Sequence, residues 1–299
     1  MKILLFGKSG QVGWELQRSL APLGELVALS RDSQELCGDF TNLGGLAQTI
    51  RAVAPDVIVN AAAYTAVDKA ESEPELARTI NTLAPGVLAQ EAKRGNAHLI
   101  HYSTDYVFNG SGDTPWCEID NAAPLNVYGE TKLEGEQRIQ QSGCRHLIFR
   151  TSWVYGTRGG NFAKTMLKLA RERDSLKVIN DQIGAPTGAD FLADVTSHAI
   201  EKMRLNPEVS GLYNLVAAGE TSWYGYACFV LGFAQRAGVE LNVVSGAIES
   251  VPTSEFSTPA KRPHNSRMNT EKLRSIFGLT PPHWEKGVER MLTEILDKK

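Results

Sequence analysis

The sequence predicts an α/β fold in which a doubly wound parallel sheet is accompanied by a smaller second domain. Short apolar runs recur through the first half of the chain, and segments of helical periodicity lie between them. The runs are apolar throughout, as expected of parallel strands buried on both faces, and cover 3–6, 26–29, 57–59, 98–102 and 147–149. Helices are expected over 12–20, 43–53, 75–94 and 128–141. This alternation is typical of a parallel, doubly wound sheet.

The pattern changes near Tyr155, after which prolines interrupt shorter elements, including a helix expected over 223–237. We therefore predict a first domain over 1–155 and mainly a second α/β domain over 156–299, part of which returns to the first. The segment 245–263 is rich in Ser, Thr and Pro and is expected to be loop rather than core.

Composition restricts the class of protein. A chain of 299 residues with 42% hydrophobic residues can bury a substantial core. Its net charge of -3 argues against a surface built to bind nucleic acid or an anionic membrane. The four cysteines are isolated from one another, which favours a reducing compartment. The initial apolar run ends at Phe6, far short of a signal sequence or a membrane span, so a cytoplasmic protein is expected.

A glycine-rich loop follows the first predicted strand directly. Its sequence is Gly7-Lys8-Ser9-Gly10-Gln11-Val12-Gly13, and a helical pattern begins within it. The first glycine allows a sharp turn, the second allows a pyrophosphate to approach the backbone, and the third allows the helix to pack closely. Gly7, Gly10, Gln11, Val12 and Gly13 are thus candidate dinucleotide-binding residues. With 27 glycines in the chain, an ordinary strand-to-helix turn is the alternative.

The end of the second strand bears on the choice of cofactor. Ser30 stands where an acidic residue would bind the ribose hydroxyls of NAD. Arg31 follows and is placed to meet a 2′-phosphate. We therefore expect NADPH to be accepted, with NADH tolerated because Arg31 is not part of a larger basic cluster. A solvated arginine at a strand end is the alternative.

Three residues form a candidate catalytic group. Tyr128 and Lys132 are four positions apart, and so lie on one face of a helix that begins near Asn126. This spacing alone is often accidental. Thr104, however, follows the predicted strand 98–102, at the edge where open parallel sheets bind ligands. We expect the ammonium of Lys132 to lower the pKa of the Tyr128 phenol, so that Tyr128 donates a proton to a carbonyl reduced by a nicotinamide.

Taken together, these residues make the chain resemble the dTDP-4-dehydrorhamnose reductase family of the extended short-chain dehydrogenase/reductases, whose sheet is of the Rossmann type. The resemblance covers nearly the whole chain. It is carried by the segments 10–13 (GQVG), 38–41 (GDFT), 60–65 (NAAAYT), 103–108 (STDYVF), 150–155 (RTSWVY) and 181–187 (DQIGAPT), and by Arg262-Pro263 with Asn265-Ser266.

The resemblance implies roles for further residues. It places Asp39 and Phe40 at the adenine of the cofactor, and Ala62, Ala63 and Tyr64 along the ribose and phosphates, with Thr65 and Tyr102 in the same site. It places Thr104, Asp105, Tyr128 and Trp153 at the deoxysugar, with Arg262 at the substrate diphosphate. The residues alone leave other readings open. Asp39 could cap the helix beginning near Asn42, Phe40, Tyr64 and Trp153 could be packing residues, and Arg262 could be solvated.

The implied reaction is reduction of the C4 ketone of dTDP-4-dehydro-6-deoxy-L-mannose to dTDP-L-rhamnose, in a homodimer that uses NADPH or NADH. Related dehydratases carry an acid after the Thr-Asp pair, and here Tyr106 stands there. The resemblance also implies a use of Mg²⁺, whose ligands the sequence does not locate; Asp190, Asp194 and Glu289 are only exposed-carboxylate candidates. A nucleotide-sugar epimerase or dehydratase, and a non-catalytic NADP-binding regulatory subunit, remain alternatives.

Overall fold

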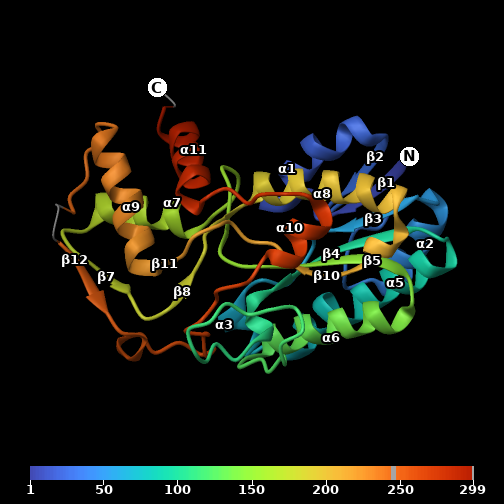
Figure 1. Ribbon diagram of the computed structural model, residues 1–299, viewed down its shortest axis with the longest axis horizontal. Helices are drawn as coiled ribbons and strands as arrows, with labels where there is room; N and C mark the ends of the chain where they lie inside the picture. Colours follow the sequence, from blue (N-terminus) through green and yellow to red (C-terminus); the bar gives the residue numbers. More distant parts are fainter. Residues whose placement is uncertain (244–246, 298–299) are drawn as a thin grey trace.

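The computed structural model describes residues 1–243 and 247–297 and is built around a six-stranded parallel sheet (Figure 1). The strand order is β10-β5-β4-β3-β1-β2. The strands are β1 (Lys2–Phe6), β2 (Glu25–Leu29), β3 (Val57–Asn60), β4 (His98–Thr104), β5 (Arg145–Thr151) and β10 (Gly211–Asn214). The predicted doubly wound parallel fold is confirmed. The inner strands are buried on both faces of the sheet, whereas the edge strand β2 is only partly buried apart from Leu29.

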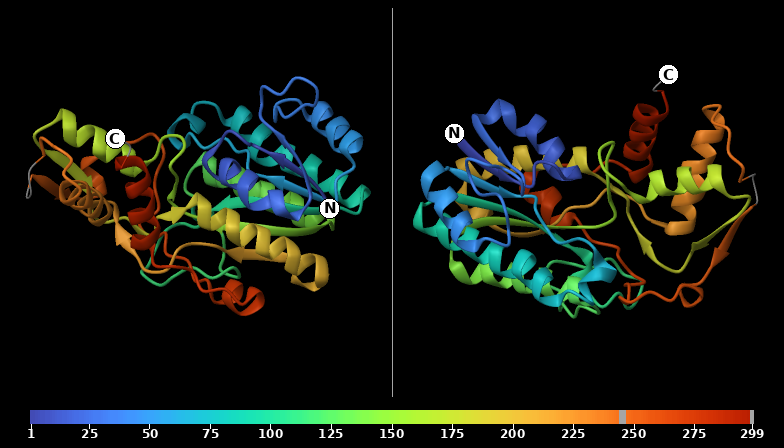
Figure 2. Two further views of the ribbon diagram at one scale, coloured as in Figure 1. Left: turned by 90° about the horizontal axis from the view of Figure 1, so that it is seen from above. Right: turned by 180° about the vertical axis from the view of Figure 1, so that it is seen from behind.

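Helices cover both faces of this sheet (Figures 1 and 2). One face carries α1 (Gln11–Leu20) and α8 (Ala189–Leu205), whose residues Leu16, Leu20 and Leu192 join the core beneath them. The opposite face carries α2 (Leu43–Val53), α5 (Ala84–Arg94) and α6 (Val127–Ser142). A shorter helix, α10 (Glu271–Phe277), adds buried Leu273 and Phe277 to the first core. Both faces of the sheet are therefore covered by packed helices.

The helix expected over 75–94 is interrupted. It consists of α4 (Pro74–Arg78), a π-helical segment (Thr79–Leu83) and α5. Pro85 has no backbone N–H, so the usual bond to the carbonyl of Asn81 is missing, and Ala84 donates instead to Thr79. The carbonyl left free at Asn81 faces α6, where a β-carbon added to Gly135 would lie only 2.2 Å from that oxygen. The glycine thus lets α6 pack closely over the interruption.

A smaller part of the molecule lies beside the sheet, at the left of Figure 1. It packs α7 (Phe162–Glu172), α9 (Trp223–Arg236) and α11 (Trp284–Leu296) against β7 (Leu176–Ile179) and β12 (Ile248–Val251). The expectation of loop over 245–263 is wrong at β12, which pairs in parallel with β7 and buries Val251. Ser245 lies outside the described residues. This segment forms a strand because it pairs with β7, and local composition cannot predict such a distant pairing.

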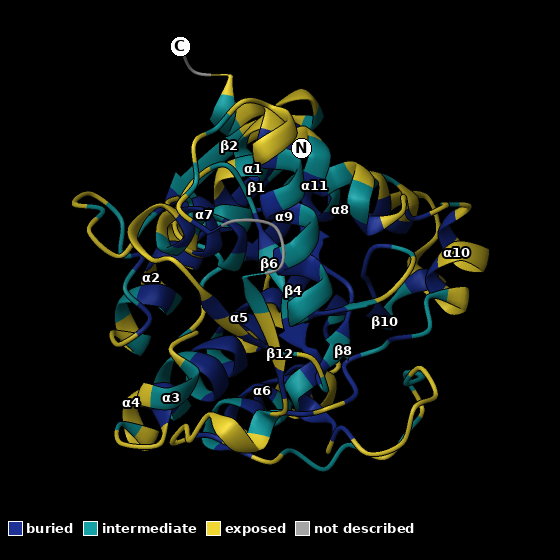
Figure 3. Ribbon diagram, turned by 90° about the vertical axis from the view of Figure 1, so that its left-hand side faces the viewer, coloured by how far each residue is buried: buried dark blue, intermediate teal, exposed yellow. Residues whose placement is uncertain are grey.

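Several elements after Tyr155 lie with the large sheet. β10 pairs with β5, and α8 packs on α1. Two short strand pairs connect the parts: β6 (Val154–Tyr155) with β9 (Thr187–Gly188), and β8 (Ile183–Gly184) with β11 (Thr221–Ser222). Figure 3 shows buried residues along the strands and exposed ones on outer loops and on α10. Within residues 1–243 and 247–297, no helix is both long and apolar enough to cross a bilayer.

Candidate active site

The glycine loop lies where the strand order reverses, because β1 pairs with β2 on one side and with β3 on the other. Gly7 has a φ of +86°, and a β-carbon there would lie 2.6 Å from the carbonyl carbon of Ala61. A β-carbon at Gly13 would lie 2.0 Å from the carbonyl oxygen of Gly7. Gly10 is different, since its nearest neighbour would be 3.5 Å away. Gly7 and Gly13 are thus required by packing, whereas Gly10 leaves space beside the start of α1.

A cavity of about 460 Å³ opens at this point. Segments that follow β1, β2 and β3 form its walls, together with residues of α4 and the neighbouring turns. Its lining residues are Gly7, Ser9, Gly10, Arg31, Asp32, Gly38, Asp39, Phe40, Thr41, Ala61, Ala62, Ala63, Tyr64, Lys69, Glu73, Leu76 and Ile80. Open α/β sheets bind their ligands at such a reversal of strand order, so this cavity is the candidate nucleotide site.

Half of the sixteen predicted cofactor residues line this cavity, and eight do not: Gln11, Val12, Gly13, Ser30, Thr65, Tyr102, Tyr128 and Lys132. The side chain of Gln11 is bonded instead to the carbonyl of Val154 and to Asn161. Sequence reasoning missed several lining residues. Ser9, Gly38, Thr41 and Ala61 stood within or beside the quoted motifs, whereas Lys69, Glu73, Leu76 and Ile80 carried no signal.

The side chains that line the cavity differ in their exposure and in their interaction partners. The Arg31 side chain is 79% exposed and has only Asp32 within ion-pair distance, at 3.7 Å. Phe40 is buried and packs edge-on against Phe6, with centroids 5.5 Å apart. Tyr64 donates to Glu73 at 2.7 Å. Asn42, rather than Asp39, caps α2, accepting from the N–H of Gly45. Of the two cations that line the cavity, Arg31 has the longer ion-pair contact and the more exposed side chain, because Lys69 lies 2.8 Å from Glu73.

The predicted catalytic residues are brought together by the close approach of α6 to the end of β4. The Asn126 side chain caps α6 by accepting from Gly129 at 2.8 Å. A β-carbon at Gly129 would lie 2.2 Å from the carbonyl oxygen of Tyr106. The first turn of α6 is therefore held against residues 104–106, and the Tyr128 hydroxyl is hydrogen-bonded with Thr104. The aromatic rings of Tyr106 and Tyr128 also touch edge to face.

Burial controls the protonation of Tyr128 and Lys132. Burial raises the pKa of Tyr128 to about 12, with Thr104 opposing the shift and Asp105 adding to it. Burial also lowers the pKa of Lys132 to about 8, which Glu136 opposes. The expectation that Lys132 lowers the pKa of Tyr128 is therefore wrong for this state. The Lys132 Nζ lies 2.5 Å from the carbonyl oxygen of Tyr102 and 3.3 Å from Nε2 of His101.

Asp105 is a buried carboxylate next to Thr104. It accepts from the Thr104 hydroxyl at 3.0 Å, while its Oδ2 atom has no hydrogen-bond partner. Burial raises its pKa to about 6, and hydrogen bonds from Ser266 and Thr104 oppose the shift. An unpaired buried oxygen is costly and is often found where a ligand completes the hydrogen bonding. Asp105 thus has unused capacity to accept a hydrogen bond.

The other predicted substrate residues lie around Asp105. Ser266 is a hydrogen-bonding neighbour of Asp105 and lies next to Gly184. The ring of Trp153 packs against the same glycine. Trp153 has a φ of +49°, which is strained for a tryptophan, and its ring stacks on Trp223 with centroids 3.6 Å apart. Arg262 lies 2.6 Å from Asp68 and also bonds with Tyr106. The candidate substrate residues therefore surround the end of β4 from both parts of the molecule.

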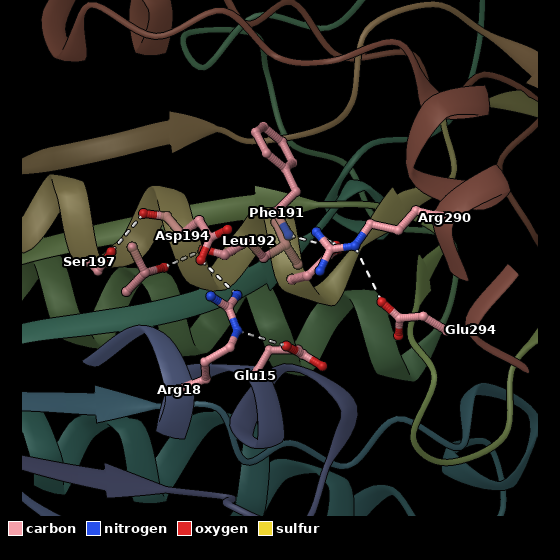
Figure 4. Close-up of polar contacts among 10 residues, drawn as sticks. Glu15, Arg18, Phe191, Leu192, Asp194, Ser197, Arg290 and Glu294 are labelled. Atoms are coloured by element: carbon pink, nitrogen blue, oxygen red, sulfur yellow. Dashed lines mark hydrogen bonds and ion pairs between the residues drawn. The ribbon is translucent and has the colours of Figure 1, made fainter. Parts of the chain in front are cut away.

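The candidate metal ligands do not gather into a site. Asp194 lies 2.7 Å from Arg18, Asp190 lies 3.3 Å from Arg290, and Glu289 lies 3.3 Å from Lys286. Figure 4 shows the Arg18 guanidinium pointing to Glu15 and Asp194, and Arg290 pointing to Glu294. In the part of the chain that the structure describes, no three His, Cys, Asp or Glu side chains are grouped to hold a metal. These residues do not fit a Mg²⁺ site.

Comparison with known proteins agrees with this geometry. Residues 1–296 match the family model described as RmlD substrate binding domain. A dTDP-4-dehydrorhamnose reductase of Shigella flexneri is 59% identical over 295 residues, which are 99% of this chain and 98% of that protein.

Two solved structures extend the likeness to the fold. A dTDP-4-dehydrorhamnose reductase of Clostridium acetobutylicum superposes with a TM-score of 0.89 at 33% identity, covering 99% of both chains. One of Bacillus anthracis, in complex with NADP, superposes with a TM-score of 0.86 at 34% identity, covering 98% of this chain and 99% of that one. The chain therefore belongs to the dTDP-4-dehydrorhamnose reductase family, within the extended short-chain dehydrogenase/reductases.

Proposed function

We propose that this protein is an NAD(P)H-dependent reductase that converts the C4 ketone of dTDP-4-dehydro-6-deoxy-L-mannose into the alcohol of dTDP-L-rhamnose. The observation that carries the proposal is the meeting of Tyr128 with Thr104 at the end of β4, beside the cavity at the strand reversal. Relatives at 59% identity bear the name of this activity, which supports the choice of substrate.

In the proposed reaction Tyr128 is the proton donor. Its raised pKa keeps the phenol protonated at neutral pH, so the proton is present when it is needed. The bound nicotinamide supplies the hydride that reduces the ketone carbon. Tyr128 transfers its proton to the ketone oxygen, and Thr104 would donate a hydrogen bond to that oxygen once its hydroxyl turns away from Asp105. Lys132 lies on the same face of α6 and, as an ammonium, would hold the nicotinamide ribose.

Asp105 and Trp153 would orient the sugar. The free Oδ2 of Asp105 would accept from a sugar hydroxyl, and Trp153 would cover the sugar ring. Arg262 would meet the diphosphate once it exchanges Asp68 for the substrate. The larger part, 1–155 with later elements that join its sheet, would bind the cofactor. The smaller part, mainly within 156–299, would complete the sugar-nucleotide site.

The cofactor is proposed to be NADPH, with NADH tolerated. Arg31 supports this choice because it lines the cavity and is exposed. A relative of 34% identity bound to NADP supports it as well. We also propose a cytoplasmic homodimer. The four cysteines are all free, as is typical of a reducing compartment. No step uses Mg²⁺, whose ligands stay unassigned.

Two other functions predict different outcomes in one assay. Purified protein is mixed with NADPH and the 4-keto sugar nucleotide, and oxidised cofactor and sugar products are both measured. The proposal predicts one cofactor oxidised per dTDP-L-rhamnose formed. An epimerase or dehydratase would change the sugar without net oxidation of cofactor. A regulatory subunit would bind NADPH tightly and turn over no keto sugar. Tyr106 favours reduction, since related dehydratases carry an acid at the position that it occupies.

A further inference from the structure

A buried polar chain connects the nucleotide cavity to Lys132. Asn60, His101 and Lys132 are each at most 2% exposed. Asn60 and His101 are register partners at the neighbouring strands β3 and β4, so their side chains lie side by side on the face covered by α6. His101 follows apolar residues of the same strand and takes no part in the proposed proton transfer. Such a group in an apolar core calls for a physical reason.

One backbone N–H determines which atom donates and which accepts in the hydrogen bonds among Asn60, His101 and Lys132. Ala62, which lines the cavity, donates its N–H to Oδ1 of Asn60 at 3.0 Å. A backbone N–H can only donate, so this contact identifies the amide oxygen of Asn60. The Asn60 amino group must then face Nδ1 of His101, 2.9 Å away. Nδ1 therefore accepts, and the proton of the neutral ring resides on Nε2.

This assignment determines what Lys132 can do. Its Nζ lies 3.3 Å from the protonated Nε2 and 2.5 Å from the carbonyl of Tyr102. A neutral amine satisfies both contacts, since its lone pair accepts from His101 while it donates to Tyr102. An ammonium has three donors and no acceptor, so it would oppose the Nε2–H. The Nε2–H therefore makes it easier for Lys132 to lose its proton, while a pKa of about 8 leaves most of Lys132 as an ammonium at neutral pH.

We infer that His101 is a positioning residue that directs its Nε2–H at Nζ of Lys132, and that Asn60 sets this arrangement by keeping the ring proton on Nε2. The inference rests on the proposed function only in assigning Lys132 a role at the nicotinamide. His101 thereby tunes the proton affinity of Lys132 to the pH at which the protein works, which general acid–base chemistry requires.

The charges around the chain agree with this arrangement. Burial lowers the pKa of His101 well below its ordinary range, with Lys132 and His146 adding to the shift. Burial lowers the pKa of Lys132 as well, and only Glu136 opposes it. Glu136 is itself paired with Arg150 of β5, at 2.7 Å. A neutral His101 ring therefore adds no second positive charge beside Lys132 at this point of the core.

An isosteric substitution tests the assignment. In Asn60→Asp, both carboxylate oxygens accept, so one keeps the N–H of Ala62 and the other requires a proton on Nδ1 of His101. The ring tautomer then reverses, Nε2 accepts from Lys132, and the ammonium becomes favourable. Ring-nitrogen NMR distinguishes protonated from unprotonated nitrogens, and comparison with His101→Gln assigns the His101 signals among the six histidines.

We expect an unprotonated Nδ1 in the wild type and a protonated Nδ1 in Asn60→Asp. We also expect the alkaline limb of the kcat/KM profile to move up by about one pH unit in Asn60→Asp. In the double variant with His101→Gln most of that shift should disappear, because the ring that transmits it is gone. His198→Gln is the matched control, because the His198 ring contacts the carbonyl of Phe277 away from this site, and it should match the wild type in both measurements.

Two results would overturn the inference. One is a protonated Nδ1 in the wild type. The other is an equal shift of the alkaline limb in Asn60→Asp and in the double variant, which would mean that the added charge acts directly on Lys132. The NMR arm requires neither substrate nor turnover. A wild type that reduces no keto sugar therefore contradicts the proposed function and leaves the tautomer measurement to decide the inference.

Discussion

The ring of Tyr106 packs edge-on against the ring of Tyr128, with centroids 5.5 Å apart and planes at 77°. This contact involves the ring of Tyr128 and leaves its hydroxyl to Thr104. Tyr128→Phe therefore keeps the packing and removes only the proton donor. We expect turnover to fall by about 10²- to 10⁴-fold, with NADPH binding largely unchanged. Stopped-flow turnover and cofactor titration would measure the two effects separately.

A matched control for Tyr128→Phe is Tyr213→Phe. Tyr213 is buried in the same sheet, and its hydroxyl donates to the carbonyl of Val209, away from the site. Turnover of this variant should remain close to that of the wild type. If Tyr128→Phe retains near-wild-type turnover, Tyr128 is not the proton donor.

The glycines of the loop should separate folding from binding. In Gly10→Ala the new methyl group has open space, so stability should be nearly unchanged, but the methyl would occupy the surface offered to a pyrophosphate. In Gly13→Ala the methyl would collide with the carbonyl oxygen of Gly7 at 2.0 Å, and folding itself should suffer. Thermal melts combined with NADPH titration test both. Unweakened NADPH binding by a folded Gly10→Ala protein would exclude the cavity as the pyrophosphate site.

Arg31 is expected to select the cofactor. A charge-assisted hydrogen bond to the 2′-phosphate is worth about 1.5–3 kcal/mol, or roughly ten- to a hundredfold in affinity. Arg31→Ala should weaken NADPH binding by about that factor and leave NADH binding nearly unchanged. Dissociation constants for both cofactors in both proteins give the answer, and an unchanged ratio of the two constants would remove the proposed role.

The buried carboxylate of Asp105 should lower the free energy of unfolding at neutral pH, although it contributes to substrate binding. Its folded-state pKa is raised from 3.8 to about 6, so the folded protein binds this proton more tightly than the unfolded chain does. The resulting contribution to stability is present at low pH and is lost as pH rises through 6. Asp105→Asn should therefore raise the free energy of unfolding at pH 7 by on the order of 3 kcal/mol, while weakening substrate binding.

Urea unfolding at several pH values measures this effect. The advantage of Asp105→Asn should shrink as the pH is lowered towards 4, where the wild-type carboxyl is protonated in the folded protein as well. A gain that does not depend on pH would show that the carboxylate charge is not its cause.

Local pattern was enough to predict most of the central fold. The run 43–53 became α2 with those bounds, and the apolar runs became strands, because periodicity records which faces are buried. Pro85 and Asn81 interrupted the helix expected over 75–94, an effect of one missing N–H that periodicity does not register. β12 escaped prediction because its pairing partner, β7, is about seventy residues away.

The sequence by itself determined the order of the chemical groups: a glycine loop after the first strand, Thr104 after the fourth, and Tyr128 with Lys132 on one helix face. Only the tertiary structure decided how those groups are protonated. Burial raises the pKa of Tyr128 and lowers that of Lys132, and a hydrogen bond beginning at Ala62 orients Asn60 and His101. Residue order specifies which groups are present. Desolvation and hydrogen-bond direction arise only when distant strands and helices enclose them.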